Sequence, residues 1–161
     1  LEYNLEISSD VDERYNLEKS TIAACKYLKK AHAKFNSWTL AAAAYNMGPS
    51  GLSKQIKRQK TDDYFSLHLN SETARYVYRI VAIKCIMKFP KAYGFNYVKS
   101  DLYPPFTYTT YEVDSSINNL IDFSTEINTN YKLLKKANPW LRSGKLSNPT
   151  NKKYIIKTVK G

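Results

Sequence analysis

Residues 44–49, Ala-Tyr-Asn-Met-Gly-Pro, are the stretch that decides the fold of this 161-residue chain. They complete a run of four alanines. Because alanine has a high helix propensity and a small side chain, we expect a buried helix over residues 37–47. Gly48 supplies the left-handed stop of that helix, and Pro49 suits the first turn of the next one, where its missing N–H costs nothing. The Tyr-Asn pair therefore belongs to the last turn of a buried helix, at the edge of the core.

Two longer helical patterns flank this central helix. Residues 17–35 repeat apolar side chains every three or four positions, while lysines occupy the other faces, so one side is expected to be buried. Residues 71–89 form the second pattern, with an acidic side chain in the first turn and a proline directly after the end. The stripes expected to face inward are Ile22, Cys25, Leu28, Ala31 and Phe35 in the first helix and Tyr76, Ile80, Ile83 and Met87 in the second.

The composition changes near Gly94. Residues 95–110 hold prolines, tyrosines and threonines in no clear period, which is typical of a connector. The rest of the chain predicts a strand, two short helices and a second strand, at residues 108–113, 117–123, 131–137 and 154–159. The expected fold class is therefore mainly α, with a helical domain at residues 1–95, a linker at 96–107 and a small α+β strand-helix-helix-strand module at 108–161.

The chain is strongly basic. Its formal net charge of +11 comes from 25 basic and 14 acidic residues, which are spread along the whole length. Such a surface attracts polyanions, and charge alone leaves nucleic acid, anionic lipid and an anionic cell-wall polymer open. No run reaches the roughly 18 apolar residues that a membrane span needs. A signal or lipid-attachment segment, and with it any membrane anchoring, is expected upstream of Leu1.

Cys25 and Cys85 both occupy apolar positions of helical patterns, which predicts two buried free thiols. The sequence leaves open a bridge between them, because it does not say whether their Cα atoms come within bonding range. His32 and His68 stand alone, without a second His, Cys or carboxylate at metal-ligand spacing. We therefore expect no metal site and no cofactor.

The motifs at the ends of two helices resemble a known family. Tyr45 and Asn46, in Ala-Tyr-Asn, and residues 72–77, Glu-Thr-Ala-Arg-Tyr-Val, are similar to the Ala-Tyr-Asn and Glu-Thr-x-x-Tyr-Val motifs of the soluble-lytic-transglycosylase (SLT) domain. That domain has the goose-type lysozyme-like helical fold. Residues 12–15 and 23–28 resemble the membrane-bound lytic murein transglycosylase D branch, and the resemblance spans roughly residues 1–95.

This resemblance implies an enzyme of the bacterial cell envelope, in the periplasm or at the outer membrane, that acts on peptidoglycan. Members cleave the β-1,4 bond between N-acetylmuramic acid and N-acetylglucosamine, and the muramyl 6-hydroxyl closes on the anomeric carbon to give a 1,6-anhydro product. A glycan groove needs aromatic faces and short amides or hydroxyls. Taken one at a time, such residues also fit core tyrosines and a capping asparagine, but the paired motifs favour the groove. By resemblance, the substrate-binding residues are Tyr45, Asn46, Gly48, Glu72 and Tyr76, and the Tyr76 hydroxyl supports catalysis near the catalytic carboxyl.

The catalytic carboxyl itself is expected outside this chain. In the family, one glutamic acid in a Glu-Ser motif acts first as acid and then as base, and it must be protonated near neutral pH. That motif is expected upstream of Leu1, so the chain as it stands is expected to be inactive. Its own carboxylates have other interpretations: Asp12 and Glu13 as cap or surface groups, Asp62 and Asp63 as solvated loop residues, and Glu72 also as a helix-dipole partner.

Residues 108–159 resemble a LysM domain, a small module that binds glycans containing N-acetylglucosamine. Residues 133–139, Leu-Leu-Lys-Lys-Ala-Asn-Pro, are close to its Leu-x-x-x-Asn-Pro pattern. By resemblance, Asn138 and Pro139 contribute to glycan binding. The usual Gly-Asp-Thr-Leu turn after the first strand is replaced by residues 114–117, Asp-Ser-Ser-Ile, and this departure bears on glycan affinity.

The leading hypothesis is a peptidoglycan-cleaving enzyme whose partners are peptidoglycan glycan strands. One rival is a non-catalytic glycan-binding protein, whose longer parent also lacks the glutamate. The other rival is a basic nucleic-acid-binding module. Its charge is suitable, but no recognition motif is present, so no nucleic-acid partner is expected. The oligomeric state, and the choice between endo and exo cleavage, are not set by the sequence.

Overall fold

The computed structural model describes residues 2–159 and groups the chain into two compact units. One unit is Ala24–Leu102, and the other joins Leu1–Ala23 to Tyr103–Gly161. The contacts thus group residues 2–23 with the C-terminal module, whereas the sequence motifs assign them to the helical domain. The domain boundaries expected from the sequence stay a prediction, and their outermost residues, 1, 160 and 161, lie outside the described part.

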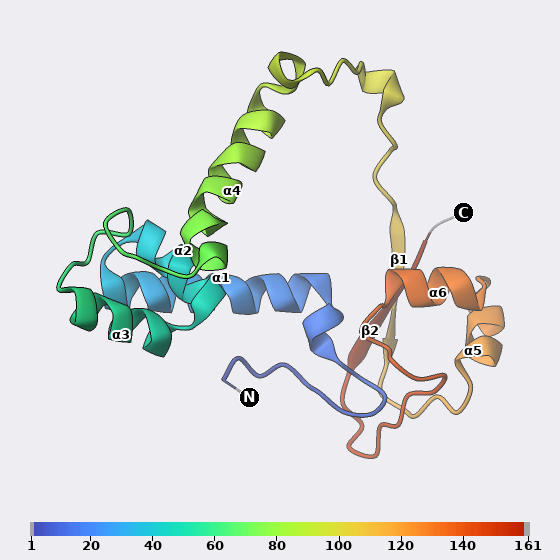
Figure 1. Ribbon diagram of the computed structural model, residues 1–161. Coiled ribbons are helices and arrows are strands. Elements are labelled where there is room, and N and C mark those ends of the chain that lie inside the picture. Colours follow the sequence, from blue (N-terminus) through green and yellow to red (C-terminus); the bar gives the residue numbers. More distant parts are fainter. Residues whose placement is uncertain (1, 160–161) are drawn as a thin grey trace. The chain divides into compact units, whose positions relative to one another are not determined.

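The helical unit is built around the alanine-rich helix (Figure 1). Ser37 caps this helix, because its Oγ accepts a hydrogen bond from the N–H of Leu40 at 3.3 Å. Gly48 has φ +86° and ψ 145°, so its φ is positive as expected, but its ψ lies outside the left-handed helical region. Pro49 follows directly as the first residue of the next helix. The helices are α1 (Leu17–Phe35), α2 (Trp38–Met47), α3 (Pro49–Gln59) and α4 (Ser71–Lys88), with short 3-10 turns at Pro90–Tyr93 and Lys99–Asp101.

The core of this unit surrounds α2. Ala41, Ala43 and Ala44 are fully buried. Their small side chains let neighbouring helices come close, as the sequence predicts. The other buried core residues are Ala31, Leu40, Leu52, Tyr64, Leu67, Leu69 and Val77.

The inward stripe predicted for α4 is wrong. Thr73 and Val77 are the buried side chains of this helix, while Ile83 and Met87 are 58% and 76% exposed. A helix rises about 1.5 Å per residue, so α2 covers only part of the longer α4. Most of the large apolar side chains beyond Val77 are therefore exposed: Tyr78, Ile80, Val81, Ile83 and Met87. Tyr76 is half-buried and Ile80 is exposed.

The inward stripe predicted for α1 is also only partly buried. Ala31 is buried and Phe35 is half-buried, but Ile22 and Cys25 are exposed. The prediction of two buried thiols is therefore wrong for Cys25, and Cys85 is only half-buried. Both cysteines are free.

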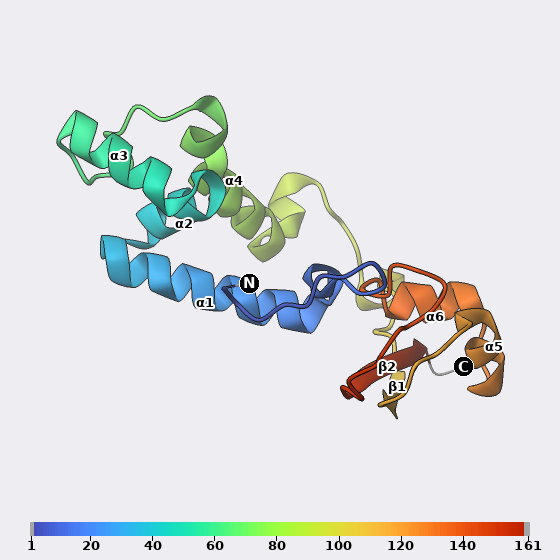
Figure 2. The ribbon, with the colours of Figure 1, turned by 90° about the horizontal axis from the view of Figure 1, so that it is seen from below.

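The C-terminal unit has the predicted order of strand, helix, helix and strand (Figure 2). The two strands pair antiparallel, with Tyr111 opposite Ile156. The first of the two helices begins three residues later than predicted, because Asn119 caps it by accepting a hydrogen bond from the N–H of Ile121 at 2.9 Å. The elements are β1 (Tyr108–Val113), α5 (Leu120–Glu126), α6 (Tyr131–Ala137) and β2 (Tyr154–Val159).

Residues 91–110, which include the predicted linker, are exposed throughout. Over residues 2–159, no helix is long and apolar enough to cross a membrane.

Asn138 joins α6 to β2. Its side chain is fully buried, and its Nδ2 donates to the carbonyls of Leu134 at 2.8 Å and Lys157 at 2.7 Å. Its Oδ1 accepts from the N–H of Lys157 at 2.8 Å. The amide therefore uses both donors and its carbonyl on backbone groups of its own unit, which is a structural role.

Replacing Asn138 with Ala should destabilise the C-terminal unit by about 3 kcal/mol, because it leaves buried backbone groups of α6 and β2 without partners. Urea denaturation followed by the fluorescence of the buried Trp140 measures this change. Asn118→Ala, at an exposed position of the same unit, is the matched control and should have little effect. Equal stability of the two variants would contradict the structural role of Asn138.

Candidate functional site

Tyr45 lies in the last turn of α2 and is 46% exposed. Its ring meets the ring of Tyr27 edge-on, with 5.4 Å between the centroids. The Tyr27 hydroxyl donates to the carbonyl of Ala44 at 2.7 Å, one residue before Tyr45. The Tyr45 ring is therefore supported on one side and open to solvent on the other, as an aromatic platform for a sugar ring requires.

Asn46 connects α2 to the start of α4. Its Oδ1 accepts a hydrogen bond from the hydroxyl of Thr73, which is fully buried, at 2.8 Å. Asn70 caps α4, since its Oδ1 lies 2.9 Å from the N–H of Thr73 and 3.2 Å from the Thr73 hydroxyl. The hydrogen bond between Thr73 and Asn46 joins the two motifs that the sequence pairs, the Ala-Tyr-Asn segment and the Glu-Thr segment. This hydrogen bond orients the Asn46 amide, and within residues 2–159 no hydrogen bond from the Asn46 Nδ2 to another side chain or to the backbone is found.

Two residues that support this corner were missed by the sequence argument. Tyr64 is 3% exposed, and its hydroxyl lies 2.8 Å and 2.9 Å from the carbonyls of Thr73 and Ala74. Burial raises its pKa. Asn70 was recognisable as a cap, because an asparagine directly before a helical pattern is the usual N-cap signal. Tyr64 sits in a loop and had no comparable signal.

The other predicted groove residues are less closely tied to Asn46. Glu72 pairs with Arg79 of its own helix, with 2.7 Å between Oε1 and Nη1, and both side chains are exposed. Tyr76 is half-buried, one turn after Thr73. Gly48 forms the turn between α2 and α3. The structure therefore brings Asn46 and Thr73 into contact. Glu72 does not join them, because its carboxylate pairs with Arg79 on the exposed side of α4.

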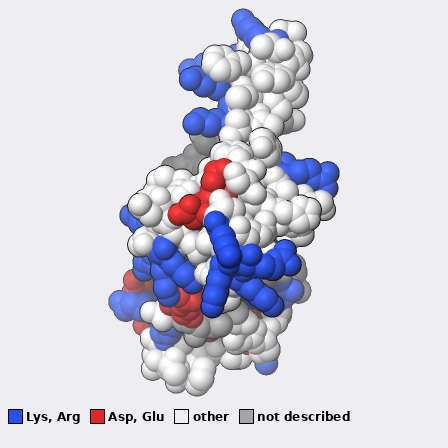
Figure 3. All heavy atoms as spheres, turned by 60° about the vertical axis from the view of Figure 1, so that its left-hand side comes forward, with Lys and Arg blue, Asp and Glu red and all other residues white. Residues whose placement is uncertain are grey.

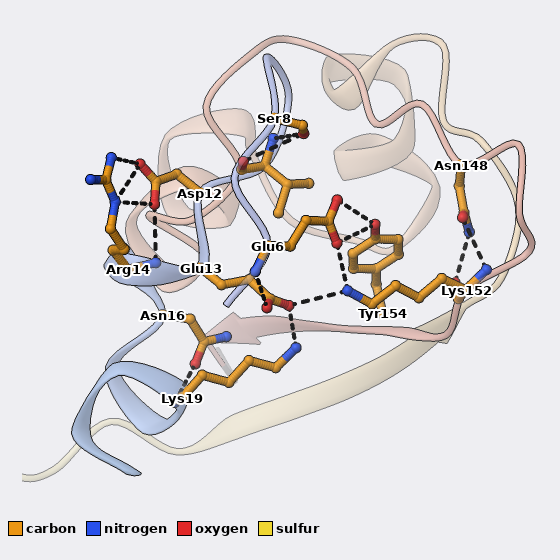
Figure 4. Close-up of polar contacts among 11 residues, drawn as sticks. Glu6, Ser8, Asp12, Glu13, Arg14, Asn16, Lys19, Asn148, Lys152 and Tyr154 are labelled. Atoms are coloured by element: carbon orange, nitrogen blue, oxygen red, sulfur yellow. Dashed lines mark hydrogen bonds and ion pairs between the residues drawn. The ribbon is translucent and has the colours of Figure 1, made fainter. Parts of the chain in front are cut away.

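Asp12 and Glu13 lie in the C-terminal unit (Figure 4). Asp12 caps the 3-10 turn Glu13–Tyr15, which confirms its interpretation as a cap. It is buried, however, and its Oδ2 pairs with the Arg14 Nη2 at 2.6 Å. Glu13 is also buried, and its Oε2 accepts from the N–H of Glu6 at 2.9 Å. Its Oε1 pairs with Lys19 and lies 3.5 Å from Lys152. Interpreting Glu13 as a surface group was therefore wrong.

Both carboxyls are held ionised. The Arg14 hydrogen bond is the main cause of the lowered pKa of Asp12. Burial by itself raises the pKa of Glu13, but the Glu6 N–H and Lys19 outweigh it, so the pKa lies below its ordinary value. A general acid needs the opposite shift. In the described part of the chain, every carboxyl whose pKa departs from its ordinary value is shifted downward: Asp10, Asp12, Glu13, Glu18 and Asp63.

Several hollows lie in the C-terminal unit, and two of them involve residues that the LysM resemblance singles out. One, of about 450 Å³, is lined by the β1–α5 loop and α5, and it includes residues 114–117, which replace the usual LysM turn. Pro139 lines the other hollow, of about 190 Å³, together with Tyr108 and Trp140. The predicted glycan-binding pair is thus divided, because Pro139 is exposed at a hollow whereas Asn138 is buried.

On the face drawn in Figure 3, lysine and arginine side chains cover a larger area than aspartate and glutamate side chains do. Helices α1 and α3 contribute exposed lysines and an arginine to the surface of the helical unit: Lys26, Lys29, Lys30, Lys34, Lys54, Lys57 and Arg58. This surface suits an anionic polymer. Within residues 2–159, no group of three or more His, Cys, Asp or Glu side chains is placed to hold a metal ion.

Two family models match separate parts of the chain. Residues 2–67 match the family model described as "Transglycosylase SLT domain", and residues 109–159 match "Soluble lytic transglycosylase C-terminal LysM-like domain". The chain carries an SLT transglycosylase segment and a LysM-like domain. The SLT match includes Tyr45, Asn46 and Gly48 and ends before Glu72 and Tyr76.

Similar proteins carry the same family name. The chain is 35% identical over 104 residues to "Membrane-bound lytic murein transglycosylase D" of Escherichia coli strain K12, and equally to that of strain O6:H1 CFT073. Each match covers 62% of this chain and 23% of the relative. The chain therefore spans about a quarter of the length of these relatives. Together with the SLT match, this similarity supports a relationship between the chain and the lytic transglycosylase family.

The buried carboxylates predict a loss of stability in acid. A group whose pKa is lower in the folded than in the unfolded chain stabilises the fold above its unfolded pKa, and this contribution is lost as pH falls through the folded pKa. The unfolding free energy of the C-terminal unit should therefore be steady near pH 7 and should fall below about pH 4.5, the ordinary value of Glu13. Urea denaturation at a series of pH values measures it.

Glu13→Gln should flatten this acid dependence, whereas Glu126→Gln, at an exposed position of α5, should leave it unchanged. If the unit is as stable at pH 3 as at pH 7, the carboxylates do not act as the structure indicates.

Proposed function

We propose that this chain is part of a bacterial lytic transglycosylase that cleaves the β-1,4 bond between N-acetylmuramic acid and N-acetylglucosamine in peptidoglycan. In this reaction the muramyl 6-hydroxyl attacks its own anomeric carbon as the glycosidic oxygen leaves with a proton, giving a 1,6-anhydro product. The observation that carries the proposal is the Asn46–Thr73 hydrogen bond, which joins the two motifs of the family into one corner. The SLT match and the similarity to membrane-bound lytic murein transglycosylase D support it.

The groove residues have distinct roles in this proposal. The open face of Tyr45 lies against a sugar ring, and the available Nδ2 of Asn46 donates to a glycan oxygen. Tyr76 supports the catalytic carboxyl through its hydroxyl. The glycan strand is the partner, and the bacterial cell envelope, in the periplasm or at the outer membrane, is the compartment where this substrate is found.

A further part of the proposal is that the general acid is not among the carboxyls of this chain. It is supported by the downward pKa shifts of Asp12, Glu13 and Asp63, because each favours the ionised form at neutral pH. The exposed ion pair of Glu72 with Arg79 argues against Glu72 as well. A Glu-Ser segment upstream of Leu1 is the proposed source of the acid.

The same pKa shifts favour a second candidate, a non-catalytic glycan-binding protein. The two candidates share the groove and differ only in whether a glutamic acid is supplied upstream of Leu1. Reading the coding sequence upstream of Leu1 for a Glu-Ser motif separates them.

This chain should release no 1,6-anhydromuropeptides from purified peptidoglycan, since every described carboxyl whose pKa is shifted is shifted toward the ionised form, and the proposed acid lies upstream of Leu1. Mass spectrometry of the soluble products checks this expectation, with a lysozyme digest as the positive control for substrate quality. An anhydro product above the enzyme-free level would mean that one of the described carboxyls is the acid.

In a longer form that carries the Glu-Ser motif, Asn46→Ala should lower turnover at least about tenfold and cost only about 1 kcal/mol of stability. The stability cost is small because Asn70 also accepts from the Thr73 hydroxyl. Release of anhydromuropeptides per folded molecule, with thermal unfolding alongside, measures both effects.

Tyr76→Phe should lower turnover with a nearly unchanged melting temperature, since it removes only a hydroxyl. Tyr78→Phe is the matched control on the exposed side of the same helix and should keep full activity. If Asn46→Ala or Tyr76→Phe unfolds the domain and leaves activity per folded molecule intact, the groove assignment fails even though the family remains.

A further inference from the structure

Residues 6–18, which we name the acidic strap, have a charge opposite to that of the chain as a whole. They hold Glu6, Asp10, Asp12, Glu13 and Glu18 against a single Arg14, so their formal charge is 1 minus 5, or −4, in a chain of +11. The SLT match begins at residue 2 and therefore includes the strap. In the structure, however, the strap belongs to the same compact unit as the LysM-like domain.

Backbone hydrogen bonds join the strap to the α6–β2 loop, residues 138–153. The N–H of Asp12 donates to the carbonyl of Trp140 at 2.9 Å, and the N–H of Arg142 donates to the carbonyl of Asp10 at 2.7 Å. Val11 and Leu141 form an antiparallel bridge between these bonds. The strap thus pairs with the loop as a short strand would.

The strap also completes the hydrophobic core of the LysM-like domain. Val11 is 1% exposed and belongs to the same buried cluster as residues from both strands, both helices and the loop. A buried core residue of this kind contributes stability through its apolar area, so removing the strap opens the core to water. The other buried members of the cluster are Leu120, Leu134, Trp140, Leu141, Leu146, Tyr154 and Ile156.

Asp10 is the polar centre of the contact. Its side chain is 4% exposed, Oδ1 accepts from the Ser143 hydroxyl at 2.9 Å, and Oδ2 accepts from the N–H of Ser147 at 3.0 Å. Hydrogen bonds that donors make to an ionised acceptor are among the stronger ones in proteins. Asp10 therefore fixes the loop at two points, one on each side of Leu146.

Charged pairs surround this centre. Glu6 pairs with Lys152 at 2.5 Å and accepts from the buried Tyr154 hydroxyl at 2.9 Å (Figure 4). Glu18 pairs with Lys157 of β2. The acidic side chains of the strap thus meet basic side chains on the loop and on the strand that follows it.

We propose that the α6–β2 loop of the LysM-like domain is a docking surface for the acidic strap, and that the domain depends on the strap for its own stability. The loop uses the N–H groups of Arg142 and Ser147, the Ser143 hydroxyl and the Trp140 carbonyl on the strap. The α6–β2 loop therefore binds a segment that lies within the SLT match, and these hydrogen-bonding groups are not free to bind a glycan. The proposal is independent of the catalytic function.

Hydrogen exchange on the whole chain, followed by mass spectrometry, tests this proposal with Asp10→Asn. The substitution keeps the size of the side chain but places an NH₂ group against a hydroxyl or N–H donor. Exchange in residues 138–148 and in β2 should become about tenfold faster or more, while α2 and α4, in the other unit, keep their protection. Asp62→Asn, in an exposed loop of the helical unit, is the matched control and should leave both regions unchanged.

A milder variant covers the case in which Asp10→Asn unfolds the whole chain. Ser143→Ala removes one of the donors to Asp10 and leaves the carboxylate in place, so it should accelerate exchange in the same segments to a smaller degree. Faster exchange confined to residues 8–12, with β2 and residues 138–148 protected as before, would overturn the proposal. The LysM-like domain would then be self-sufficient, and the strap would only rest on it.

Discussion

The need to pair every buried backbone N–H and C=O governs this structure. The helices and strands β1, α5, α6 and β2 of the C-terminal unit have only six or seven residues each, so loops carry much of this unit, and regular hydrogen bonding cannot satisfy the loops. Side chains complete the pairing instead. Asn148 is a clear case, because its Nδ2 donates to the carbonyls of Asp114 and Lys152 and its Oδ1 accepts from the N–H of Lys152. Among the described residues, no buried side-chain nitrogen or oxygen lacks a partner.

The same constraint shapes the candidate groove. Asn70 and Tyr64 satisfy backbone groups at the start of α4, and this fixes Thr73 beneath the groove. Thr73 in turn orients Asn46. A side chain that binds a sugar must be held in one geometry before the sugar arrives, since ordering it afterwards costs affinity. In the proposed function, Thr73, Asn70 and Tyr64 thus hold Asn46 in place for a glycan without lining the groove themselves.

Electrostatics divides the molecule into two kinds of surface. The excess of lysine and arginine gives the chain a formal net charge of +11, and such a charge attracts anionic polymers. Three carboxylates, Asp10, Asp12 and Glu13, are instead buried, and each of them is hydrogen-bonded. Burial of a carboxylate is tolerated there because hydrogen bonds and cations compensate the lost hydration. The result is a set of ionised groups that stabilise a contact and do not serve as acids.

The sequence by itself determined the local elements and the family. The bounds of α1, α6, β1 and β2 follow from apolar periodicity and caps, and the Ala-Tyr-Asn segment carries the family resemblance, because these signals lie within a few residues of one another. Only the tertiary structure decided which apolar stripes are buried. Ile83 and Met87 have ideal helical spacing, but whether they are covered depends on how far α2 extends alongside α4.

Tertiary structure alone also decided the roles of Asn138 and of residues 6–18. A pattern such as Asn-Pro after a helix does not say where its amide points, and that depends on the backbone of β2, which lies 19 residues away. Asp10 meets Ser143 across 133 residues of chain. Such contacts have no local signature, because they arise from chain segments that come together only in the folded state.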